Sequence, residues 1–168
     1  MKNLFVIMIA LVISMSAFSQ KKDVVDIAVG SADHSTLVAA IKAADLVTTL
    51  KSAGPFTVFA PTNAAFDKLP AGTVESLLKP ENKAQLAKIL TYHVVSGNLD
   101  AAAVIAAIKK GKGKVELTTV STGKLTASMD NGKVKLTDES GNSAYVTATD
   151  LKGSNGVIHV IDGVLLPK

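Results

Sequence analysis

The sequence predicts an α+β fold, with helices in the first half of the chain and strands in the second. Between residues 23 and 50 apolar residues recur at helical spacing, whereas from Lys114 onward they alternate with polar residues, as in half-buried strands. Residues 54–66 and 155–167 contain near-continuous apolar runs, which are typical of strands covered on both faces. The sheet should therefore take strands from both halves of the chain.

The segment 54–66 has the pattern of a strand that leads directly into a helix. Its residues 57–59 are β-branched or aromatic, which favours a buried strand, and Pro61 prevents that strand from continuing. Thr62 or Asn63 can then cap a helix whose Phe66 points into the core. We expect this segment to fix the architecture, because none of these groups performs chemistry by itself.

Further helices are indicated by apolar spacing and by capping residues. The predicted caps are Asp33 or Ser35 for the second helix, Thr73 for a short one, and Asn98 or Asp100 for an alanine-rich one. Two helices are predicted between residues 23 and 50, interrupted at 30–33, and others at 73–78, 81–90 and 101–109.

Strands are predicted where the period changes to two. Asn131-Gly132 suits the two-residue type I′ turn of a hairpin, so the segments on either side of it should pair. The last segment should hold two strands, one on each side of Asp162-Gly163. The other predicted strands cover residues 91–95, 114–120, 124–129, 133–137 and 144–149.

The N-terminus has the pattern of a secretory signal peptide. Lys2 precedes an uncharged apolar run, and small residues stand just before Ser19. We predict a signal peptide at residues 1–19, with Gln20 as the alternative edge, and one domain at residues 20–168. Left uncleaved, the segment would anchor the protein, and this is the only membrane contact that we expect. The protein should then be extracellular, at the cell surface or in a periplasm.

Composition excludes several classes of function. The 168 residues include no cysteine, so disulfides, thiol nucleophiles and cysteine-bound zinc are excluded. All 18 basic residues are lysines, and an arginine-free chain lacks the guanidinium groups that nucleic-acid readers favour. We therefore expect no nucleic-acid partner. The lysines gathered at residues 109–114 follow a predicted helix end, where cations complement the helix dipole, although contact with an anionic surface is the alternative.

Three segments in this order resemble the fasciclin domain. They are residues 57–66 (TVFAPTNAAF), the Tyr92-His93 pair followed by two valines, and residues 155–167 (NGVIHVIDGVLLP). The resemblance extends over residues 23–167. It implies a wedge-shaped β-sandwich of about seven strands with several helices packed around it, within the α+β class.

The resemblance also implies a function and a set of candidate residues. Fasciclin domains serve in adhesion and matrix contact without catalytic activity, so a protein or glycan outside the cell is the expected partner and no cofactor is expected. In animal members, integrin contact is attributed to the Tyr-His region and to an Asp-Ile pair before the last segment. Tyr92 and His93 match the first, and Asp150 and Leu151 occupy the second, with leucine in place of isoleucine. The alternative for Tyr92-His93 is structural, because one residue of the pair in a strand would face the core.

The sequence contains no motif typical of a catalytic or metal-binding site. No Gly-x-Ser-x-Gly turn presents a serine, and the three histidines, His34, His93 and His159, are not spaced as a helical ligand pair. His159 lies in an apolar strand and should be a core histidine with its hydrogen bonds satisfied. The adjacent carboxylates of Asp138 and Glu139 are assigned to a solvated turn. A carrier of a small apolar ligand, in the periplasm or envelope, is the alternative function.

Overall fold

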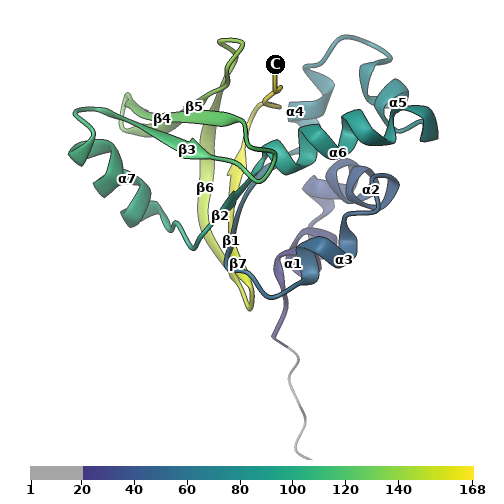
Figure 1. The fold of residues 1–168 in the computed structure, drawn as a ribbon, viewed down its shortest axis with the longest axis horizontal. Coiled ribbons are helices and arrows are strands. Elements are labelled where there is room, and N and C mark those ends of the chain that lie inside the picture. The colour runs from purple at the N-terminus through teal and green to yellow at the C-terminus, as the bar shows by residue number, and fades with distance from the viewer. Residues whose placement is uncertain (1–20) are drawn as a thin grey trace, which may run out of the picture.

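Seven strands form one continuous sheet in the computed structural model, which describes residues 21–168 (Figure 1). The predicted signal peptide at residues 1–19 lies outside the described part of the chain. The strand order is β2-β1-β7-β6-β5-β4-β3. The strands are β1 Phe56–Pro61, β2 Val94–Ser96, β3 Lys114–Thr118, β4 Lys124–Asp130, β5 Lys133–Thr137, β6 Ser143–Gly153 and β7 Gly156–Ile161.

Helices lie mostly to one side of the sheet, and α7 lies apart from them beside β3 (Figure 1). This arrangement confirms the predicted α+β class. The helices are α1 Val24–Val29, α2 Ser35–Ala43, α3 Val47–Lys51, α4 Asn63–Asp67, α5 Thr73–Leu77, α6 Lys83–Tyr92 and α7 Ala101–Lys110, with short 3-10 turns at Ala32–His34 and Pro80–Asn82.

The sheet bends until its two edges nearly meet. Strand β1 pairs in parallel with β7 and antiparallel with β2, whereas β3 to β6 form an antiparallel meander. The long strand β6 pairs with β5 near its start and with β7 over the rest of its length. Edge strand β2 approaches β3 through a bridge between Val95 and Thr119, and the Val120 amide donates to the Val94 carbonyl over 2.7 Å. The two halves of the sheet therefore face each other, and these two contacts join edge strand β2 to the chain just after β3.

Two hydrophobic cores lie on opposite faces of β1 and β7. Along β1, Val58 and Ala60 point to the core beneath α1, α2, α3 and α6, whereas Phe59 points to the core between the sheet halves and α7. In β7, Ile158 and Ile161 divide in the same way. Burial on both faces explains why these two segments are apolar at nearly every position.

Helix starts confirm some predicted caps and correct others. Thr62 caps α4 by accepting from the Ala65 amide, and Asp100 caps α7 by accepting from the Ala103 amide over 2.8 Å. Neither Asp33 nor Ser35 caps α2; the cap comes from Asn63, whose Oδ1 accepts from the Thr36 amide over 3.0 Å. Thr73, predicted as a cap, is the first residue of α5, because Gly72 takes the preceding position in a left-handed conformation.

The second of the two helices predicted between residues 23 and 50 is in fact two helices, and the predicted strand 91–95 is wrong at its start. Asp45 adopts a positive φ of 60°, which separates α2 from α3. Helix α6 continues through Tyr92, and the His93 amide donates to the Leu90 carbonyl over 3.1 Å, so β2 begins only at Val94. Helical burial of successive apolar residues outweighs the strand preference of the tyrosine.

The second half of the last segment is likewise not a strand. Residues 164–167 form no ladder, and the Leu165 and Leu166 amides donate to side chains instead. The hairpin at Asn131-Gly132 is confirmed, with both residues at positive φ as a type I′ turn requires.

Truncation of the two cores should show their contribution to stability. We expect Phe59→Ala to lower the free energy of unfolding by about 3–5 kcal/mol and Ile158→Ala by about 2–5 kcal/mol, because each leaves a cavity among buried neighbours. Urea denaturation followed by circular dichroism measures both losses. Met129→Ala, at a side chain that is 38% exposed, is the control and should change stability by less than about 0.5 kcal/mol. Parent-like unfolding of both core variants would contradict this placement of the cores.

Candidate functional site

Tyr92, at the end of α6, is fully enclosed by the core between the sheet halves. Its hydroxyl donates to the Lys124 carbonyl over 2.6 Å and accepts from the Glu139 amide over 3.2 Å. Gly123 lies against the ring, and a Cβ at that position would stand 2.5 Å from Tyr92 Cε2. Burial raises the pKa of the Tyr92 phenol. The side chain therefore joins α6 to the start of β4 and to the turn after β5.

His93 is buried between the end of α6 and the C-terminal segment. Its Nδ1 lies 2.9 Å from the Ile89 carbonyl, and its Nε2 lies 3.0 Å from the Leu165 amide. Since a carbonyl only accepts and an amide only donates, Nδ1 carries the proton and Nε2 accepts. Burial lowers the pKa of His93 to about 4, so the ring is neutral at physiological pH.

Asp138, after β5, supports the same C-terminal segment. Its Oδ2 accepts from the Leu166 amide over 2.9 Å, and its Oδ1 accepts from the amides of Ser140 and Asn142. The side chain is buried, which corrects its assignment to a solvated turn; only the neighbouring Glu139 is exposed. His93 and Asp138 thus take the two successive amides that a strand would have paired.

The structure therefore places Tyr92 and His93 in the interior, where neither side chain offers surface to a partner. Both residues of the pair are enclosed, because a helix end surrounded by two cores replaces the alternating strand that was expected. Their hydrogen bonds fix how α6, β4 and the C-terminal segment meet. This is a positioning role, and the prediction that a partner contacts this region stays a prediction.

Asp150 lies at a bulge in β6. Residues Thr149 and Asp150 together face the single residue His159 of β7, and Asp150 adopts a positive φ of 60°. The Asp150 carboxylate accepts from the Ala101 amide at the start of α7 over 2.9 Å, and the Asp150 amide lies 3.4 Å from His159 Nδ1. The bulge thus holds an exposed carboxylate in a fixed position against the helix.

Leu151, the next residue, is 39% exposed and lies on the side of β6 that meets α1. It lines a small apolar cavity of about 20 Å³ with His34, Ile158 and residues of α1. The imidazole Nε2 of His34 is buried there without a hydrogen-bond partner among the described residues. Burial lowers the pKa of His34. The structure does not bring Asp150 and Leu151 together with the enclosed Tyr92-His93 pair.

The exposed stretch around Asp150 was not evident from the sequence. Strand β5 pairs only with Ser143, Ala144 and Tyr145 of β6, so residues 147–152 have a neighbouring strand on one side alone. Every residue from 147 to 152 is exposed. The one sequence signal is Asp150 itself, since aspartate tolerates the left-handed backbone of a bulge better than most residues.

All three imidazoles of the chain are buried, which bears on catalysis. His159 confirms its assignment as a core histidine: its Nε2 donates to the Leu99 carbonyl over 2.7 Å and its ring stacks on Phe59 at 5.7 Å. Within residues 21–168 no three acidic or imidazole side chains gather in a way that could hold a metal ion.

The cavities do not favour a carrier of an apolar ligand. The apolar cavity beneath α7, lined by Phe59, Val104 and His159, holds about 10 Å³, whereas ligand pockets usually measure about 300–1,000 Å³. A hollow of about 400 Å³ lies near the narrow end of the wedge, but it is open and lined largely by glycine and polar residues such as Asn98, Lys152 and Ser154.

The Fasciclin domain family model matches residues 32–167. The chain belongs to the fasciclin domain family. Protein sll1483 of Synechocystis is 52% identical over 156 residues, a match that covers 93% of this chain and 79% of that protein.

Relatives elsewhere share the domain within longer chains. The transforming growth factor-beta-induced protein ig-h3 of Sus scrofa is 39% identical over 86% of this chain and 19% of its own length. The cell surface glycolipoprotein MPB83 of Mycobacterium bovis is 37% identical over 73% of this chain and 48% of its own. A solved FAS1 domain pair from the insect cell adhesion molecule fasciclin I has a TM-score of 0.75 at 20% identity, over 86% of this chain and 51% of that chain. That likeness confirms the fasciclin fold.

The buried neutral ring of His93 should make the fasciclin domain less stable in acid. Below its ordinary pKa of 6.5 the unfolded state binds a proton at His93 that the folded state does not, down to about pH 4. The free energy of unfolding should therefore fall as pH falls through this window, by roughly 3 kcal/mol from His93. The lowered pKa of His34 acts in the same direction. The pKa of Asp26 is lowered chiefly by a hydrogen bond from Lys51, so its contribution to the free energy of unfolding is lost only below about pH 3.8.

Urea denaturation between pH 7 and 4, with an NMR titration of the His93 ring, measures this loss of stability. A His93 ring that titrates near pH 6.5 would contradict the prediction.

Proposed function

We propose that this fasciclin-domain protein is a non-catalytic binding module that mediates adhesion outside the cell. After removal of a signal peptide at residues 1–19, residues 20–168 act as one domain that is secreted or held at the cell surface. Its partner is a protein or glycan of the cell surface or surrounding matrix. The partner contacts the exposed stretch of β6 at residues 147–152, which includes Asp150 and Leu151.

The observation that carries this proposal is the rigid exposure of that stretch. A bulge, a helix start and His159 hold Asp150, while Leu151 presents an apolar surface beside it. The open side of the strand also leaves backbone groups available to an extended partner segment. Carboxylate, leucine side chain and strand edge together supply charge, apolar area and directional hydrogen bonds.

Two further observations support a binding role. His93 and His159 are enclosed and committed to backbone partners, and His34 is enclosed as well, so none is placed to exchange protons with a substrate in solvent. Among the relatives, MPB83 is named a cell surface glycolipoprotein, and the solved insect structure is that of a cell adhesion molecule. Within the described residues no helix is both long and apolar enough to cross a membrane.

Tyr92 and His93 contribute to binding only indirectly in this proposal. They hold α6 and the C-terminal segment in register with the sheet, and thereby keep the partner-facing strands in place. A variant such as His93→Ala should accordingly lose stability first, and binding only in proportion to the fraction unfolded.

The test is a paired substitution at the exposed stretch. Asp150→Asn with Leu151→Thr removes the charge and the apolar surface, but asparagine keeps the acceptor for the Ala101 amide and tolerates the positive φ. We expect at least a tenfold weaker association with immobilised fibronectin, collagen or envelopes of the producing cells, measured by surface plasmon resonance.

The matched control changes the same kinds of residue elsewhere. Asp67→Asn with Val120→Thr removes one exposed carboxylate and one valine that is 39% exposed, as Leu151 is. This variant should bind as the parent does. Equal weakening in both variants would assign the effect to general surface change, and absence of parent binding to every one of these surfaces would overturn the adhesion proposal.

A further inference from the structure

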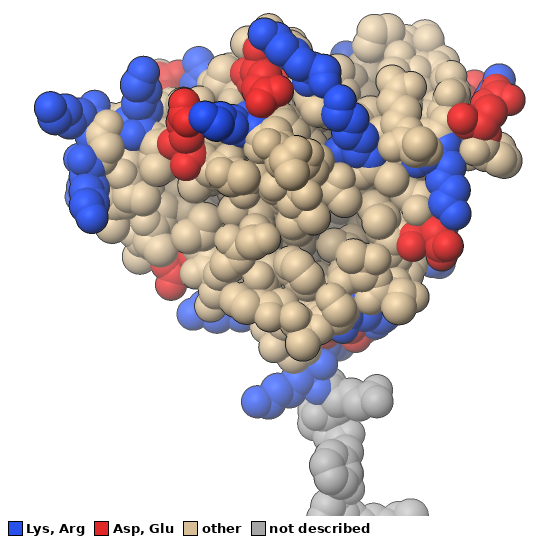
Figure 2. All heavy atoms as spheres, viewed as in Figure 1, with Lys and Arg blue, Asp and Glu red and all other residues tan. Residues whose placement is uncertain are grey.

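Lysines gather at the end of the protein where α7 finishes and β3 and β5 begin. The pairing register brings separate segments together there, since Lys114 of β3 lies opposite Ser128 of β4, and Ser128 lies opposite Lys135 of β5. Figure 2 shows the resulting group of basic side chains at the left of the molecule. We call it the lysine end, and it consists of Lys109, Lys110, Lys112, Lys114, Lys133 and Lys135.

The lysine end makes the distribution of charge over the protein strongly asymmetric. Its six lysines and Asp130 sum to a formal charge of +5, and the nearby Glu116, two residues from Lys114, is paired with Lys124 over 3.1 Å. The other 11 lysines and 13 acidic residues of residues 21–168 leave the rest of the protein at −2. Asp130 is itself engaged, because its carboxylate accepts from the Tyr145 hydroxyl over 2.7 Å and lies 4.0 Å from Lys135 Nζ.

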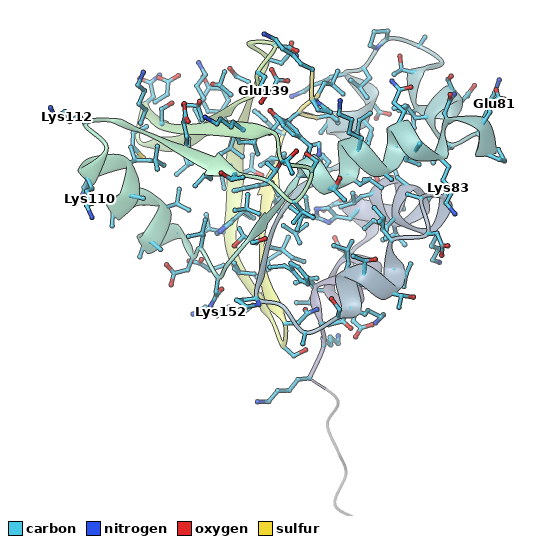
Figure 3. The ribbon with its side chains drawn as sticks, in the orientation of Figure 1. Glu81, Lys83, Lys110, Lys112, Glu139 and Lys152 are labelled. Carbon is cyan, nitrogen blue, oxygen red and sulfur yellow. The ribbon has the colours of Figure 1, made fainter. Side chains whose placement is uncertain are left out.

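Folding accounts for only some of these lysines. Lys109 and Lys110 occupy the last turn of α7, where positive charge is favourable to the helix dipole. Lys112 is different, because it stands in the following turn at a positive φ of 57°, which costs a side chain with a Cβ roughly 1–2 kcal/mol and which glycine or asparagine adopts more readily. In Figure 3 Lys110 and Lys112 both extend away from the body of the protein.

Lys114 and Lys133 also lack a stabilising partner. Both are exposed, and among the described residues no acidic oxygen lies within 4.0 Å of either ammonium group or of that of Lys112. Three lysines thus stand at this end of the protein without an ion pair that would stabilise the fold, and one of them, Lys112, occupies an unfavourable backbone conformation. A strained position of this kind points to a role in function.

The neighbouring face of the sheet has the chemistry of a sugar-binding surface. Lys114, Ser128, Lys135 and Tyr145 stand opposite one another on four adjacent strands, so their side chains share the outward face. The row spans about 15 Å and offers cation, hydroxyl, cation and aromatic ring in turn. Met129, the exposed apolar residue of β4, belongs to the opposite face by alternation, so this outward row carries no aliphatic group to enter a lipid layer.

We infer that the lysine end, with its cross-strand row, is a binding surface for an acidic polysaccharide. This inference rests on the proposed extracellular binding function and names the chemistry of one partner. The ammonium groups pair with carboxylate or sulfate groups along the polymer, while Ser128 and Tyr145 contact sugar hydroxyls and ring faces. Lysine ammonium groups are hydrated point charges, so binding should weaken steeply with added salt.

The test removes the three lysines that the fold does not need. Lys112→Asn suits the left-handed backbone, and Lys114→Thr and Lys133→Thr suit strand ends, so the triple variant should melt at or above the temperature of the parent. The probe is immobilised alginate, a polymer of uronic acids, with dextran as the neutral comparison. We expect the parent to bind alginate but not dextran, and the triple variant to bind alginate at least tenfold more weakly.

A charge-matched control separates this surface from net charge. Lys22→Gln, Lys42→Gln and Lys79→Gln remove three exposed lysines that likewise lack an ion pair among the described residues. This control should bind alginate within about twofold of the parent, because screened charges far from the surface contribute little.

Four results would overturn the inference. They are an absence of parent binding to alginate, equal binding to dextran, equal weakening in the control, and tighter lysine-dependent binding to phosphatidylglycerol vesicles or to DNA than to alginate. The variant at Asp150 and Leu151 should retain alginate binding, so failure on alginate with intact binding to cells or matrix would reject this inference alone.

Discussion

The parallel pairing of β1 with β7 is the interaction on which both hydrophobic cores depend. It joins Phe56 to Gly156, 100 residues later, and continues to Pro61 and Ile161. The pair contributes side chains to the helix-covered core from one face and to the core between the sheet halves from the other. Gly156 permits the close approach, because a Cβ there would lie 2.1 Å from the Phe56 carbonyl oxygen. A pairing so distant in sequence forms only when the chain between has closed into its loop, and the burial of two faces must offset that entropy.

Hydrogen bonds from polar side chains stabilise the ends of helices and the C-terminal segment, which the sheet itself does not pair. Asn155, just before β7, accepts from the Val24 amide over 3.1 Å and donates to the Leu50 carbonyl over 2.7 Å, which ties α1 and α3 to the strand pair. Asn63 does the same for α2. His93 and Asp138 hold the last residues of the chain. Each of these side chains pairs with a buried or partly buried backbone group, so the fold uses single residues where longer ladders would be needed.

The elements whose signals are local follow from the sequence, and those that depend on distant partners do not. The β1 segment, the cap at Thr62 and the Asn131-Gly132 hairpin are specified by neighbours in the chain, and all are found as predicted. The cap of α2 comes from a residue 27 positions away, and the amides of residues 165 and 166 go to side chains 72 and 28 positions away. No periodicity records such contacts. The candidate site shows the same division: Asp150 and Leu151 are exposed, but the Tyr92-His93 pair is enclosed because α6 runs on into residues with strand preference.

The residues that identify the family and the surfaces that could meet a partner are therefore different parts of this molecule. The parts of segments 57–66 and 155–167 that form β1 and β7 are buried in the central strand pair, so their residue types are set by packing, whatever the protein binds. The exposed stretch of β6 lies toward the narrow end of the wedge, and the lysine end lies at the start of β3 and the β4–β5 hairpin (Figure 1). The exposed stretch of β6 holds one carboxylate and one lysine and is formally neutral, whereas the lysine end carries a charge of +5, so the two surfaces suit different partners. In the adhesion role that we propose, the sheet keeps these two surfaces apart, so that two partners can bind to one small domain at once.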